Sequence, residues 1–270
     1  MLDTEKRNEN TIHIDKMSTI EMLKVIQAEN INAVNSVNNA LESIEKAVDA
    51  AYLSLKKGGR IIYVGAGTSG RLGVVDASEC PPTFGVSPET VVGVIAGGKG
   101  AMFKSSENTE DIGESGVNDL KDINLCVNDI VMGISAAGGA GYVIKALEYA
   151  KSLGCVTVGI TSNKNTLLGK TVDIEIVTET GPEVITGSTR MKAGTAQKLV
   201  LNMISTSVMV KMGYVYENLM INLKPSNSKL KGRMVRIVSD ILNVENEDAE
   251  VLLENSGWNI KEAIKFYRGE

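Results

Sequence analysis

Short runs of β-branched residues recur along the chain, and stretches with helical periodicity separate them. Four runs read as buried strands and a fifth as an outer strand, at residues 61–65, 91–98, 129–135, 156–162 and 173–179. This alternation predicts an α/β fold: a mainly parallel central sheet with helices on both faces. Ligands of such sheets bind at the carboxyl ends of the strands. Those ends are rich in Gly, Ser and Thr, and they lie at 65–70, 97–98, 135–141 and 161–163.

Helical periodicity also divides the chain. Residues 18–57 carry apolar positions at helical spacing and stop at Gly58-Gly59. The composition turns polar after Pro225, and residues 229–268 predict three short helices. Further helices are expected at 99–106, 110–121, 142–153 and from about Arg190 to Met212. We therefore expect an N-terminal helical segment (1–57) packed on a core (58–225), followed by a small three-helix module (226–270).

The composition excludes several classes of function. The net charge is −5, with no cluster of Lys and Arg, so neither nucleic acid nor a membrane surface is expected as a partner. The polar N-terminus lacks the apolar core of a signal peptide, and no run of about 18 apolar residues predicts a membrane span. We expect a cytoplasmic protein with reduced cysteines. Because His13 is the only histidine, we expect no metal site and no Ser-His-Asp triad.

The loop GAGTSG (65–70) fits the dinucleotide pattern G-x-G-x-x-G between a strand and a helix. A dinucleotide site also needs an acidic residue at the end of the second strand, which here ends VIAGG without a carboxylate. Gly67, Thr68 and Ser69 instead suit a terminal phosphate monoester at a helix N-terminus. The plainer alternative is that the glycines only form a tight turn. We favour phosphate binding over that turn and rank a dinucleotide below both.

Two longer segments carry a family resemblance. GAGTSGRLGVVDASECPPTFG (65–85) and TGSTRMKAGTAQKLVLNM (186–203) resemble the N-acetylmuramic acid 6-phosphate etherases. These are sugar-isomerase-type (SIS) domain proteins related to the glucokinase regulatory protein. The resemblance implies a three-layer SIS fold, a homodimer, no cofactor, and a role in cell-wall sugar recycling. It also implies a lyase that converts N-acetylmuramic acid 6-phosphate, a phosphorylated amino sugar, into N-acetylglucosamine 6-phosphate and D-lactate.

The resemblance assigns catalysis to Glu79 and Glu110. In the implied reaction a base removes the C2 proton, the C3 oxygen leaves with lactate, and water then adds to the double bond. Such an elimination needs a general acid and a general base but neither metal nor redox cofactor. Glu79 is expected to protonate lactate, in a loop made rigid by Pro81-Pro82, and Glu110 to act as the base. The alternatives are a solvated loop carboxylate for Glu79 and the acidic first turn of a helix for Glu110.

Hydroxyls and cations before the long helix are further candidates. Ser188 and Thr189 can cap that helix or turn toward a ligand, while Arg190 and Lys192 either add charge to the site or lie on the surface. By resemblance this segment borders the sugar site and the dimer partner.

The second phosphate loop departs from the family, where it reads like A-A-S-G-R-T-P-Y. The matching stretch, 135–142, reads SAAGGAGY and lacks the family's serine, arginine, threonine and proline. Gly138 and its neighbours keep backbone amides for an anion, and Ser135 can partly replace the lost hydroxyls. A loop without its side-chain donors favours a rival function, a non-catalytic sugar-phosphate sensor. A phosphosugar isomerase is a third alternative, since the same fold and a glutamate base would suffice.

Overall fold

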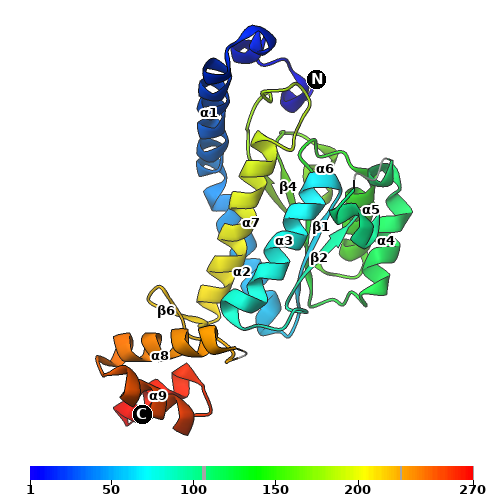
Figure 1. The fold of residues 1–270 in the computed structure, drawn as a ribbon. Helices are drawn as coiled ribbons and strands as arrows, with labels where there is room; N and C mark the ends of the chain where they lie inside the picture. The colour runs from blue at the N-terminus through cyan, green and yellow to red at the C-terminus, as the bar shows by residue number, and fades with distance from the viewer. Residues whose placement is uncertain (105–107, 226, 270) are drawn as a thin grey trace.

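The computed structural model describes residues 1–104, 108–225 and 227–269 (Figure 1). At its centre lies a five-stranded sheet in the order β2-β1-β3-β4-β5, with every neighbouring pair parallel. Its strands are β1 (Ile61–Gly65), β2 (Val91–Ile95), β3 (Ile130–Ile134), β4 (Val156–Thr161) and β5 (Ile174–Val177). The predicted α/β fold with a parallel central sheet is confirmed.

Helices cover both faces of the sheet and make three layers (Figure 1). They are α2 (Leu41–Lys56), α3 (Gly67–Phe84), α4 (Gly113–Asp122), α5 (Gly141–Ser152), α6 (Leu167–Thr171) and α7 (Lys192–Lys211), while α1 (Thr19–Ser36) packs outside them on α7. On one face Ile61 and Tyr63 pack with α2, α3 and α7; on the other Ile62 and Val64 pack with α4, α5 and α6. Successive strand residues face opposite sides. A strand covered on both faces therefore reads as an unbroken apolar run.

Three departures from the sequence expectations exceed a residue or two at an element's end or change its type. After β2 the chain forms the 3-10 turn η5 (Gly98–Met102) instead of a helix over 99–106, and residues 105–107 lie outside the described residues. The helix expected at 110–121 opens with a separate 3-10 turn, η6 (Thr109–Asp111), before α4 begins. Strand β2 stops short of residue 98 because Gly97 adopts a φ of 85°, which breaks the extended backbone.

The two ends of the chain lie at opposite ends of α7 (Figure 1). Helix α1 packs along α7, preceded by the 3-10 turns η1 (Asp3–Glu5), η2 (Glu9–Thr11) and η3 (Ile14–Lys16), and η4 (Asn38–Ala40) joins α1 to α2. The C-terminal helices are α8 (Ser228–Leu242), α9 (Asn246–Asn255) and α10 (Ile260–Arg268). They share an apolar core with a hairpin, β6 (Val215–Tyr216) and β7 (Leu219–Met220), which the sequence did not predict. Within the described ranges no helix is long and apolar enough to cross a bilayer.

Candidate functional site

A cleft of about 230 Å³ opens at the carboxyl ends of β1 and β3. Ten residues were predicted for the site. Six of them line this cleft: Gly67, Thr68, Ser69, Glu110, Ser135 and Thr189. Segments 67–69 and 135–140 follow neighbouring strands, so the parallel sheet brings them to the same edge. The arrangement therefore joins both glycine-containing loops in one cavity.

Two helix N-termini meet at the cleft. Helix α3 starts after Ala66 and α5 starts after Ala140, and neither alanine can cap a helix with its side chain. The amides of the first turn of each helix consequently remain available for a ligand. An uncapped helix start attracts anions through its amide groups and its dipole. The cleft is suited to a phosphate although none of its lining side chains is cationic.

The turn into α3 requires glycine. A Cβ on Gly65 would come within 2.6 Å of the Gly70 backbone nitrogen, and Gly67 has a φ of 53° in the left-handed region. The backbone can approach this closely only without side chains. The glycines therefore form the tight turn that the sequence offered as the plainer alternative, and this turn lines the cleft.

The second loop is held in place from behind. The Ala136 carbonyl accepts hydrogen bonds from Ser162 N at 3.0 Å and from the Thr161 hydroxyl at 3.1 Å. Gly138 has a φ of 70°, and a Cβ there would lie 2.5 Å from that of Thr166. The Gly138 amide donates to Ser135 Oγ at 3.1 Å, so the Ser135 hydroxyl hydrogen stays available for a ligand. Gly138 is absent from the cleft lining and acts here as a turn residue.

Glu110 lies in the exposed turn η6 and lines the cleft. Gly141, the first residue of α5, allows this turn to pack closely, since a Cβ there would meet the Asp111 carbonyl oxygen at 3.1 Å. From the other side Arg71 of α3 donates to the carbonyls of Met102 and Lys104, both at 3.2 Å. Arg71 thus holds residues 102 and 104 to the helix that begins with the first glycine loop.

Glu79 lies elsewhere, and its predicted loop is wrong. Residues 79–82 belong to the last turns of α3, which continues through both prolines and ends at Gly85 with a φ of 64°. Glu79 is exposed and does not line the cleft. Twelve residues separate it from Gly67 on the same helix, about 18 Å at 1.5 Å per residue. One chain alone therefore does not bring Glu79 and Glu110 into a shared cleft.

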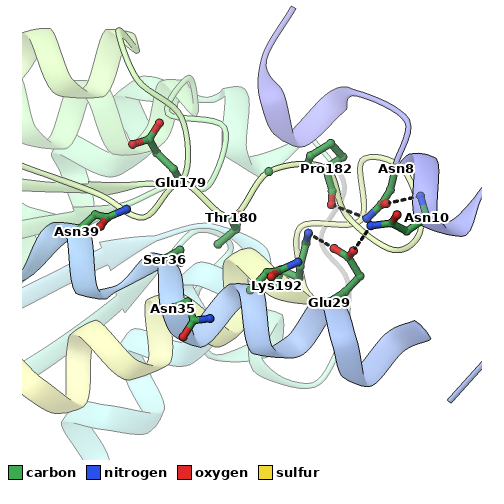
Figure 2. A pocket seen from close by; sticks show the side chains of 12 residues that line it. Asn8, Asn10, Glu29, Asn35, Ser36, Asn39, Glu179, Thr180, Pro182 and Lys192 are labelled. Carbon is green, nitrogen blue, oxygen red and sulfur yellow. Dashed lines mark hydrogen bonds and ion pairs between the residues drawn. The ribbon is translucent and has the colours of Figure 1, made fainter. Parts of the chain in front are cut away.

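Lys192 also lies outside the cleft. Its side chain is buried and forms an ion pair with Glu29 of α1, in a second cavity of about 440 Å³ rich in asparagine (Figure 2). Asn10 donates to the same carboxylate at 3.0 Å. Burial alone would raise the pKa of Glu29, but the hydrogen bonds from Lys192 and Asn10 hold it below its usual value. This lysine therefore faces a buried carboxylate, away from the phosphate loops.

A buried carboxylate caps α7. Glu183 accepts from the amides of Lys192 and Ala193, both at 2.9 Å, and burial raises its pKa. Ser188 and Thr189, which the sequence offered as caps, do not fill this role; Thr189 turns to the cleft and Ser188 does not. Arg190 lines an adjacent groove with Lys198, and this groove shares Thr68 with the cleft.

Sequence reasoning also missed residues that connect α3 to α7. Asp76 accepts hydrogen bonds from Tyr63 at 3.0 Å, Asn202 at 2.6 Å and Ser205 at 3.2 Å, and burial raises its pKa. Gln197 accepts from the Ser69 hydroxyl at 3.0 Å. No local pattern marks either residue, because each partner set spans distant segments. Within the described ranges no group of His, Cys, Asp or Glu side chains could hold a metal ion.

Known proteins match this chain along nearly its whole length. The N-terminal SIS domain of the glucokinase regulatory protein, as a family, matches residues 43–151. N-acetylmuramic acid 6-phosphate etherase 1 of Bacillus licheniformis is 51% identical over 263 residues, 97% of this chain and 86% of its own length. The etherase of Caldanaerobacter subterraneus is 52% identical over 269 residues, 100% of this chain and 88% of its own. This chain belongs to the N-acetylmuramic acid 6-phosphate etherase family.

Solved structures of lower identity share the fold with this family member. A putative phosphosugar isomerase of Bacteroides fragilis superposes with a TM-score of 0.56 at 21% identity, covering 73% of this chain and 94% of that one. A phosphoheptose isomerase of Francisella tularensis gives 0.55 at 18% identity, covering 72% and 100%. These likenesses confirm the predicted SIS-type core.

Proposed function

We propose that this etherase-family protein cleaves the D-lactyl ether of N-acetylmuramic acid 6-phosphate, giving N-acetylglucosamine 6-phosphate and D-lactate. The observation that carries the proposal is a phosphate-type cleft with a glutamate at its rim, in a chain 51–52% identical to named etherases. We further propose that it works in the cytoplasm in cell-wall sugar recycling. The proposed division is a helical segment (1–57), a catalytic SIS core (58–225) and a C-terminal module (226–270).

The phosphate is proposed to sit between the two uncapped helix starts. The first-turn amides of α3 and the hydroxyls of Thr68 and Ser135 supply hydrogen-bond donors around one anion. Holding the phosphate there fixes the sugar, so its C2–C3 edge points toward the rim that Glu110 occupies. Binding energy gained at a group remote from the reacting carbons then helps to orient them.

Glu110 is the proposed base. It removes the C2 proton after ring opening has placed an aldehyde at C1, and the C3–O bond breaks as the double bond forms. The departing lactate oxygen takes up a proton, and water later adds at C3. A carboxylate at the cleft rim can perform the proton removal without a metal or a redox cofactor.

Glu79 is the proposed acid, supplied by a second copy of the chain. Within one chain it lies about 18 Å along α3 from the cleft, and it stands on an exposed face of α3 with Val75. Helix α7 beside it exposes Met203 and Val210. We propose that these faces of α3 and α7 form a two-fold homodimer interface that carries each Glu79 toward the partner's cleft.

The test is complementation between two inactive variants, with D-lactate release as the readout. Glu79→Gln and Glu110→Gln should each lower turnover by orders of magnitude, whereas Glu114→Gln, an exposed glutamate on α4, should not. Mixing the two inactive variants after dissociation should restore about a quarter of wild-type activity. Half of the dimers are then mixed, and each has one intact site. No recovery would place both glutamates in one chain or remove one from catalysis.

A sugar-phosphate sensor is the second candidate, favoured by one observation. The cleft has no cationic lining, and the second loop lacks the family's hydroxyls and arginine. Such a protein would bind N-acetylmuramic acid 6-phosphate without releasing lactate. Membership of the etherase family favours the lyase, and the lactate assay separates the two.

A further inference from the structure

A buried glutamine lies directly behind the first phosphate loop. Gln197, on α7, is 1% exposed, and its Oε1 accepts a hydrogen bond from Ser69 Oγ at 3.0 Å. Its Nε2 is also buried and has no hydrogen-bond partner in the described part of the chain. Leaving a buried amide donor unpaired is costly. The position of this amide beside a serine that lines the cleft therefore indicates a role in that serine's hydrogen bonding.

The direction of this hydrogen bond opposes phosphate binding. A serine hydroxyl has one hydrogen, and Ser69 directs it at Gln197, away from the cleft. Toward the cleft Ser69 then presents only lone pairs, and a phosphate dianion offers only acceptors. Ser135 is arranged in the opposite sense: it accepts from the Gly138 amide and keeps its hydrogen free. The two serines that line the cleft therefore differ in hydrogen-bond polarity.

A half-turn of the Gln197 amide would reverse the polarity of Ser69. Nε2 would take the place of Oε1 and donate to Ser69 Oγ, which frees the serine hydrogen for the phosphate. The unpaired NH₂ group would gain a partner, and one polar atom of the amide would remain unpaired in either orientation. The rotation itself therefore costs little. Binding favours it, because the hydroxyl gains a charge-assisted hydrogen bond.

We propose that Gln197 is a positioning residue that sets the donor direction of Ser69, turning its amide when a phosphomonoester enters the cleft. This inference rests on the proposed function only in taking a phosphosugar as the ligand. Of the side chains of this size, only an amide can change from acceptor to donor in place. An ionised glutamate can only accept, and a methionine can neither fix nor reverse the hydroxyl.

The experiment is calorimetric titration with N-acetylglucosamine 6-phosphate, with unphosphorylated N-acetylglucosamine as the control ligand. Gln197→Glu and Gln197→Met are each combined with Ser69→Ala in double-mutant cycles. Gln197→Glu should weaken binding roughly ten- to hundredfold when Ser69 is present, the loss of one hydrogen bond to a charged group. In the Ser69→Ala background only the smaller effect of added charge should remain. Gln197→Met should weaken binding less and have no effect without Ser69.

A second measurement follows the wild-type protein and does not depend on the variants folding. The Gln197 side-chain NH₂ signals, assigned by through-bond methods, should shift on titration with inorganic phosphate and not with chloride at matched ionic strength. Equal effects of Gln197 substitutions with and without Ser69, or unmoved NH₂ signals at phosphate saturation, would overturn the proposal. If binding fails in the wild type but lactate is released, the phosphate placement is wrong; if neither occurs, the proposed function itself fails.

Discussion

Restoring the side chains missing from the second loop should strengthen phosphosugar binding. The change is Ala137→Ser together with Gly139→Arg, which supplies the hydroxyl and the cation of the family's loop. The structure has room for both: Ala137 lines the cleft, and a Cβ on Gly139 would meet no atom within 4 Å. Gly139 is also absent from the residues with positive φ, so a side chain there brings no backbone strain.

The size of the gain follows from the hydrogen bonds added. One hydrogen bond to a charged group contributes about 1.5–3 kcal/mol. Gly139 is exposed, so solvent screens the arginine and the two contributions will not add in full. We expect a total of about 1.5–3 kcal/mol, a ten- to hundredfold lower Kd. Turnover should rise as well, because the phosphate also orients the reacting carbons.

The assay is calorimetric titration with N-acetylglucosamine 6-phosphate before and after restoration. Ala137→Ser with Gly139→Met is the matched control, since it adds comparable bulk without charge and should recover only part of the gain. Equal affinity of the restored and the original protein would mean that this loop does not contact the phosphate. The ligand would then have to be placed elsewhere at the sheet edge.

Three further predictions concern stability and assembly. Lys192→Met leaves the buried Glu29 carboxylate without its cation and should lower the free energy of unfolding by about 3–5 kcal/mol. Adding Glu29→Leu should restore most of that stability, which urea titration can measure. Equal losses in the single and the double variant would contradict the ion-pair argument. Burial alone would raise the pKa of Asp129, but its hydrogen bonds with Arg60 outweigh this effect and hold the pKa below 3.8. The stability that the pair contributes is therefore present above pH 3.8 and is lost as the pH falls through the lowered pKa. The stability gap between wild type and Arg60→Met should therefore shrink below pH 3.8, and a gap that persists through acid unfolding would refute this. Sedimentation at micromolar concentration should show a dimer, and a fully active monomer would defeat the shared site.

The core was predictable because its signals are local. Strand β1 was predicted at its observed bounds, since a run of five apolar residues ending in glycine is too short for a core helix and is typical of a buried strand. That the two glycine-containing loops meet at one cleft follows from their place after neighbouring strands. Glu79 shows where local signals mislead: Pro81-Pro82 indicate a loop, yet buried Cys80 and Phe84 hold α3 in helical form around them. Tertiary packing here outweighs the local preference of proline.

The environment of the site was not predictable, because its contacts join distant positions. Lys192 pairs with a carboxylate 163 residues away, and Gln197 bonds a serine 128 residues away. A lysine beside Ser and Thr in sequence resembles a phosphate ligand, but the sequence does not show that α1 will deliver Glu29 to it. Such partners are set by how α1, α3 and α7 pack together.

The capping of α7 by Glu183 decides where an anion can go. Three helices begin around the cleft region, and each start attracts negative charge in the same way. At α7 the chain has filled that position with its own carboxylate, which as part of the same molecule stays in place at any ligand concentration. The starts of α3 and α5, which adjoin the cleft, carry no such side-chain cap. Glu183 thus competes with any anion at the start of α7, and a ligand anion is directed to the neighbouring starts of α3 and α5.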